Sequence, residues 1–67
     1  MLIVESEQEE DGRWIAEVAT LPGVMAYGKT KAEADAKVKA LALRVIADRL
    51  DNGEQLPREI AKFFEAA

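Results

Sequence analysis

Two segments near the N-terminus, residues 2–9 and 13–19, have the extended character of β-strands. Glu10, Asp11 and Gly12 separate them, and Asp-Gly between two such segments is a strong signal for a β-hairpin. Leu21-Pro22-Gly23 predicts a turn, because proline presets φ and glycine tolerates a positive φ. Residues 24–27 then predict a third strand that ends at Gly28.

Alternation along the hairpin assigns its side chains to two faces. In the first strand one face carries only acids, Glu5, Glu7 and Glu9, and the other carries Val4, Ser6 and Gln8. In the second strand one face carries Trp14, Ala16 and Val18, and the other carries Ile15, Glu17 and Ala19. The hairpin is therefore expected to have one side rich in carboxylates.

A long helix follows the third strand. Thr30 and Glu33 have the spacing of a capping box, and the alanine-rich run to Leu50 contains neither glycine nor proline. Asn52-Gly53 predicts the C-terminal cap. At 100° per residue, four apolar residues form one stripe along the helix: Ala34, Val38, Leu41 and Val45. We expect this stripe to pack against the sheet.

The apolar surface of this helix is wider than one sheet requires. Leu43, Ile46, Ala47 and Leu50 extend it around the cylinder, and this surplus predicts a second packing surface between copies of the chain. The expected homo-oligomer interface combines these four with two residues of the tail, Phe63 and Phe64.

The tail after Pro57 is ambiguous in the sequence. Ile60, Phe63, Phe64 and Ala67 have the spacing of a short amphipathic helix, and Pro57 is tolerated in a first turn. Residues 60–65 could instead add an edge strand. The expected fold is thus of the α+β class, one domain over residues 1–67, with a three-stranded antiparallel sheet packed on one long helix and a C-terminal strand or short helix.

Composition narrows the chemistry. With 67 residues, the chain has a thin core, and 49% hydrophobic and 33% charged residues indicate a globular protein. Cysteine and histidine are absent from the sequence, so disulfides, thiol nucleophiles and Cys/His zinc sites are excluded. Thr30 is explained as a helix cap, and no serine triad can form without histidine. We therefore expect no enzymatic activity and no cofactor.

Charge limits the partners. The net charge is −4, and residues 1–28 carry six acids against Arg13 alone. Nucleic acids are bound largely through phosphate contacts from lysine and arginine, so this chain is expected to bind no nucleic acid directly and to suit a basic partner. The N-terminus has neither a basic region nor a long apolar run, so no membrane association and a cytoplasmic location are expected.

The hairpin carboxylates Glu5, Glu7, Glu9 and Glu17 are the candidate functional cluster. Grouped acids can hold a magnesium ion or form a solvated face, and a solvated face can dock a basic protein. Acids that alternate along a strand are spaced by about 7 Å, twice the rise per residue, whereas a two-metal site needs them to converge. The pattern therefore favours a solvated or docking face, and metal ligands are not assigned.

The motifs in order resemble the N-terminal domain of the HicB family of antitoxins: Asp11-Gly12-Arg13-Trp14, Ala16, Leu21-Pro22-Gly23, Ala26, Gly28, Thr30 and Glu33-Ala34. The resemblance covers roughly residues 1–55. It implies a partial ribonuclease-H-like fold of order β-β-β-α-β without nuclease activity. It also implies a prokaryotic toxin–antitoxin role, in which the domain binds the small basic ribonuclease HicA and occludes its RNA-cleaving surface.

Full-length members of that family usually continue into a DNA-binding domain, and this sequence ends at Ala67, so operator binding is not expected of it. The expected function is an antitoxin-like binding module whose toxin-binding residues are Glu5, Glu7, Glu9 and Glu17. Two alternatives stay open: a solitary oligomeric binding or structural domain without a toxin partner, and a residual metal-dependent nuclease.

Overall fold

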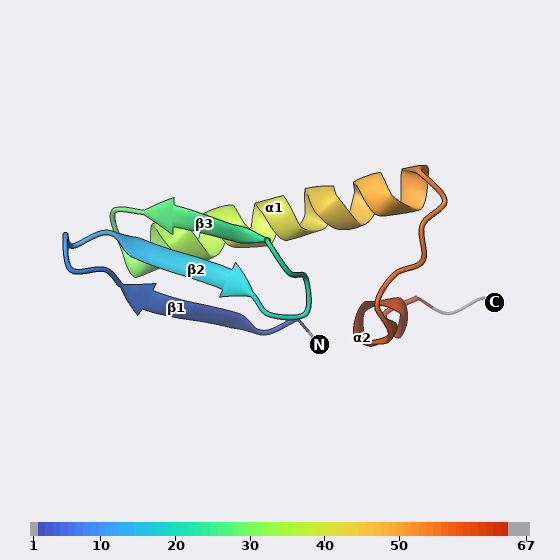
Figure 1. Ribbon diagram of the computed structural model, residues 1–67, viewed down its shortest axis with the longest axis horizontal. Helices are drawn as coiled ribbons and strands as arrows, with labels where there is room; N and C mark the ends of the chain where they lie inside the picture. The colour runs from blue at the N-terminus through green and yellow to red at the C-terminus, as the bar shows by residue number, and fades with distance from the viewer. Residues whose placement is uncertain (1, 65–67) are drawn as a thin grey trace.

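A computed structural model describes residues 2–64 and has a three-stranded sheet on one side and a long helix on the other (Figure 1). All strand pairs are antiparallel, and the order across the sheet is β1-β2-β3. The α+β fold predicted from the sequence is confirmed. Its elements are β1 (Val4–Gln8), β2 (Trp14–Val18), β3 (Met25–Gly28), α1 (Lys31–Asp51) and α2 (Arg58–Ala61).

The turn between β1 and β2 forms where Asp-Gly predicted it. The Glu9 amide donates to the Arg13 carbonyl at 2.7 Å, and the Gly12 amide donates to the Glu9 carbonyl at 3.0 Å. Gly12 has a φ of 93°, which a three-residue hairpin loop requires and which glycine adopts without steric cost. This geometry sets the register, in which Ser6 lies opposite Ala16.

Both ends of α1 are capped by the residues that the sequence indicated. The Glu33 amide donates to the Thr30 hydroxyl at 3.1 Å. At the other end the amides of Gly53 and Glu54 donate to the carbonyls of Leu50 and Arg49, the pattern of a Schellman motif. These caps satisfy backbone groups that the helix itself leaves unpaired.

The core lies between the inner face of the sheet and one row of α1. Its buried members come from β2, the β2–β3 turn, α1 and α2: Ala16, Val18, Leu21, Val24, Ala34, Val38, Ala42, Ile46 and Ile60. The sheet side is formed by the face that alternation assigned to Ala16 and Val18, so that assignment is confirmed.

On α1 the buried row differs from the predicted stripe. Ala34 and Val38 are buried as expected, but the row continues through Ala42 and Ile46, while Leu41 and Val45 are half-buried beside it. With 21 residues, α1 is about 31 Å long, and the five-residue strands β1 and β2 are about 17 Å long. The far half of α1 therefore extends past the sheet, where other segments of the chain cover it (Figure 1).

The tail forms that cover. After the C-terminal cap of α1 the chain turns back, and α2 lies beneath the far end of the helix (Figure 1). Ile60 in α2 is 1% exposed and belongs to the core cluster. The short helix indicated by local spacing is confirmed for Arg58–Ala61. The strand implied by the family resemblance is wrong for residues 58–61, because a single helical turn is enough to bring Ile60 into the core.

Candidate functional site: an uncovered acidic face of the sheet

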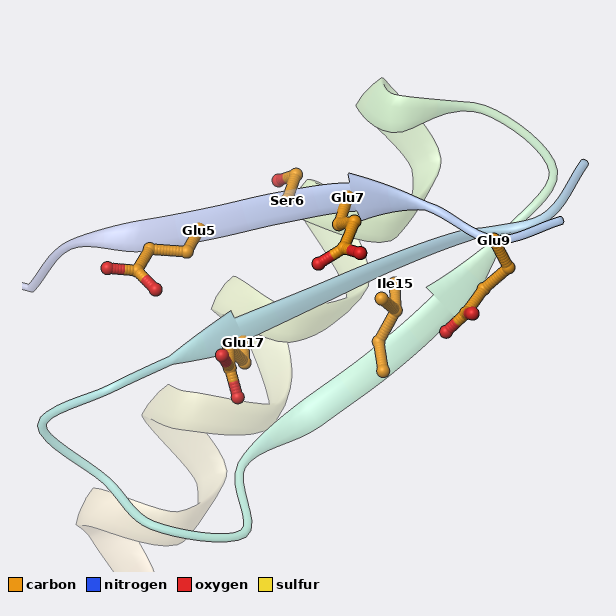
Figure 2. Close-up of a pocket in the computed structure, with 6 residues that line it drawn as sticks. All are labelled: Glu5, Ser6, Glu7, Glu9, Ile15 and Glu17. Atoms are coloured by element: carbon orange, nitrogen blue, oxygen red, sulfur yellow. The ribbon is translucent and has the colours of Figure 1, made fainter.

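One face of the sheet packs on α1, and the other face is open. On the open face, Glu5 lies opposite Glu17 and Glu7 lies opposite Ile15 (Figure 2). Glu9 follows on the same side just beyond the end of β1 (Figure 2). The four carboxylates predicted from alternation thus lie on one surface, where they line a hollow together with Ile15 and Ser6. We call this surface the acidic face: Glu5, Glu7, Glu9 and Glu17.

The acidic face concentrates charge of one sign. Glu5 and Glu17 are directly opposite each other on neighbouring strands, an arrangement in which like charges destabilise a sheet. Within residues 2–64, no ion pair engages any of the four carboxylates. The chain therefore keeps this group of acids accessible, at some cost in stability, where a cation from outside could neutralise them.

Apolar side chains border the acids on the same face. In the register of β2 with β3, Met25 lies opposite Glu17 and Tyr27 lies opposite Ile15. Met25 is 43% exposed and Tyr27 is 44% exposed. The sequence did not single out this apolar border, although alternation along residues 24–27 places Met25 and Tyr27 on one face; only the register shows that the face is the acidic one.

Arg13 lies beside Glu7 and Glu9, but within residues 2–64 it forms no ion pair with the four glutamates. Arg13 pairs with Asp11 at 2.7 Å, and its guanidinium lies 4.6 Å from the centre of the Tyr27 ring. Hydrogen bonds from the backbone and side chain of Arg13 lower the pKa of Asp11. Arg13 thus orders the hairpin turn and the Tyr27 ring instead of neutralising the glutamates.

The acids of this face are spaced too widely to share one metal ion. Glu5 and Glu7 are two residues apart on one strand, which separates them by about 7 Å. In the part of the chain that the structure describes, no three acidic side chains are grouped closely enough to hold a metal ion. The geometry is that of an extended charged surface.

A second polar group ties the other side of β1 to the helix. The Ser6 hydroxyl donates to the Asp35 carboxylate, and the Lys31 ammonium donates to the same carboxylate at 2.8 Å. Ser6, the only serine and a possible nucleophile by residue type, is therefore engaged in fastening an edge strand to the first turns of α1. The hydrogen bonds from Lys31 and Ser6 hold the pKa of Asp35 below its ordinary value.

This pKa shift predicts an acid-sensitive contribution to stability. Because the pKa of Asp35 is lower in the folded chain than in the unfolded chain, its ionised form stabilises the fold above about pH 4, and the effect is lost as pH falls through the folded pKa. We expect Asp35→Asn to lower the urea midpoint at pH 7 and the difference from the native chain to shrink below about pH 4. A difference that stays constant down to pH 2.5, about the limit of such a titration, would contradict the assignment.

The residues predicted for an oligomer interface divide into three groups. Ile46 is only 7% exposed and lies in the core cluster of the single chain, together with Leu21 and Val24 of the β2–β3 turn and Ile60 of the tail. Leu50 and Phe64 line one apolar groove with Leu56 and Ala61. Leu43, Ala47 and Phe63 are exposed elsewhere. An interface between copies stays a prediction, in which the five exposed residues offer surface and Ile46 offers little.

The fold and the acidic face define a class of protein: a small α+β domain with one sheet face packed and the other open and charged. The UPF0150 protein Ta0767 of Thermoplasma acidophilum is 34% identical to this chain over 55 residues, which are 82% of this chain and 80% of that protein. The chain belongs to the UPF0150 family. No family profile and no solved structure matches it. Within residues 2–64 neither helix has the length and apolar character needed to cross a membrane.

Proposed function

We propose that this chain is an antitoxin-like binding module of the HicB type, which neutralises a small basic ribonuclease by covering its RNA-cleaving surface. The observation that carries the proposal is the acidic face, which is open and free of ion pairs within the described residues. A surface that binds RNA must be positively charged, so the same surface is a natural counterpart for a row of carboxylates.

The apolar residues that border the acidic face favour a protein as the binding partner. Ile15, Met25 and Tyr27 place apolar and aromatic area beside the glutamates. Protein interfaces combine such area with charges at their margin, and tyrosine and methionine are enriched in them. A partner could therefore bury apolar surface against β2 and β3 while its basic residues meet β1.

Charge reversal tests this proposal. The chain is co-expressed with any small basic protein that is encoded beside it, and complex formation is measured at low and at high ionic strength. We expect the combined variant Glu5→Lys, Glu7→Lys and Glu17→Lys to weaken the complex by about tenfold or more at low salt, because attraction becomes repulsion. The native complex should also weaken as salt is added.

A matched control separates local charge from net charge. The combined variant Asp48→Lys, Asp51→Lys and Glu54→Lys changes the net charge equally, at exposed positions in the last turn of α1 and just after it. We expect it to leave the affinity within about threefold of the native value. Equal weakening by both variants, or no complex at low salt, would overturn the proposal.

A second candidate rests on a different observation. Leu43, Leu50, Phe63 and Phe64 are each at least 50% exposed, which is unusual for large apolar side chains on so small a domain. These residues support the alternative of a solitary oligomeric binding or structural domain. The two candidates differ in the experiment above, since a solitary domain forms no salt-sensitive complex with a basic protein.

A further inference from the structure

The backbone of β1 has an open edge. In an antiparallel pair, residues that exchange hydrogen bonds alternate with residues that do not. The bond from the Glu9 amide to the Arg13 carbonyl fixes this alternation, so Glu5 and Glu7 also bond to β2. Val4, Ser6 and Gln8 consequently direct their amides and carbonyls away from the sheet, and β1 is an outer strand of the sheet in the described chain.

An apolar groove lies beside this edge on the helix side. It is lined by Leu2, Val4, Val18, Ala42 and Leu43, with Lys39 at its border. The groove exists because α1 packs mainly under β2 and β3 and less under β1. Leu43 is 65% exposed there, although it is a large apolar residue.

The two faces of a strand added at this edge would meet different surroundings. Residues opposite Glu5 and Glu7 would lie on the acidic face. Residues opposite Val4 and Ser6 would lie on the helix side, next to the groove. An alternation of basic and apolar residues therefore fits the edge on both sides at once.

A second copy of β1 does not fit. In an antiparallel pair of two copies, the outward-pointing residues Val4, Ser6 and Gln8 must lie opposite one another. Every such register that pairs at least three residues of β1 places Glu5 or Glu7 opposite a glutamate of the other copy. Like charges directly opposite each other destabilise a sheet, so the edge resists pairing with itself.

We propose that the edge of β1 accepts a strand from a basic partner, with lysine or arginine alternating with apolar residues, as a fourth strand of the sheet. This inference rests on the proposed function in taking the partner to be basic. Main-chain hydrogen bonds to Val4, Ser6 and Gln8 would supply affinity, and the groove and the glutamates would supply selectivity.

Two peptides of identical composition test the inference on the full chain. One alternates lysine and valine over the length of β1, and the other has all its lysines before its valines. Because the outward amides of Val4, Ser6 and Gln8 face solvent in the free chain, we expect the alternating peptide to slow their hydrogen exchange by about tenfold at saturation. The block peptide should leave their exchange unchanged.

A proline variant adds a structural control. Gln8→Pro removes an amide that points outward, so the ladder between β1 and β2 stays intact, while pairing at the open edge is blocked. We expect Gln8→Pro to lower the affinity for the alternating peptide by about tenfold. Gln8→Ala keeps the amide, so its affinity for that peptide should stay within about twofold of the native value.

The outcomes separate the two proposals. If both peptides bind equally, the three outward amides exchange at their original rates, and Gln8→Pro has no effect, strand addition is overturned while the acidic face remains a binding site. If neither peptide binds at low salt, strand addition is overturned as well, and the co-expression experiment alone then decides the proposed function.

Discussion

Gly28→Ala is expected to destabilise the fold by about 3 kcal/mol, the upper part of the range for an overpacked core. A Cβ at this position would lie 2.5 Å from the backbone nitrogen of Ala34 and 3.0 Å from its Cα. These atoms belong to the first turns of α1, which the Thr30 cap fixes in place, so they cannot rotate away as a side chain could. Urea unfolding followed by Trp14 fluorescence measures the loss.

Gly12→Ala is the control for the loss of glycine itself. Gly12 has a positive φ but open space around it, so its replacement carries a conformational cost of about 1 kcal/mol and no steric clash. If Gly28→Ala cost no more than Gly12→Ala, the close approach of β3 to α1 would be contradicted.

The hairpin and the ends of α1 could be predicted because their determinants are local. Gly12 supplies the positive φ of the turn, and the Thr30 hydroxyl bonds to an amide only three residues away. Such signals span a few residues and do not depend on the rest of the fold.

The burial of Ile46 and the form of the tail could not be predicted in the same way. Both depend on how far α1 extends past the sheet and on where the chain returns after Gly53. Once α2 folds back, Ile60 and Ile46 enter one cluster. The surplus apolar surface that suggested an oligomer is therefore used partly within the chain and is exposed only in part.

The acidic face is intermediate between these cases. Alternation along β1 and β2 correctly placed Glu5, Glu7 and Glu17 on one side. Their surroundings depend on the register of three strands, which sets Met25 opposite Glu17 and leaves β1 at the edge. The acidic residues of the face could thus be predicted from the sequence. Its apolar border and its open backbone edge could be identified only from the structure.

Ile60→Ala is expected to cost about 3 kcal/mol, within the range for truncating a buried isoleucine. Ile60 is 1% exposed, and it is the one buried residue of α2, a helix of four residues. So short a helix has little stability of its own, since nucleation in isolation is unfavourable. Its docking therefore depends on the core contact of this side chain, and urea unfolding measures the loss.

Phe63→Ala is the matched control in the same segment. Phe63 is 60% exposed, so its truncation removes little buried area and should change the stability by no more than about 0.5 kcal/mol. If the two variants lost equal stability, Ile60 would not be the residue that anchors the tail. A large difference would establish that the part of this thin core beneath the far half of α1 is completed by the segment whose structure the sequence left open.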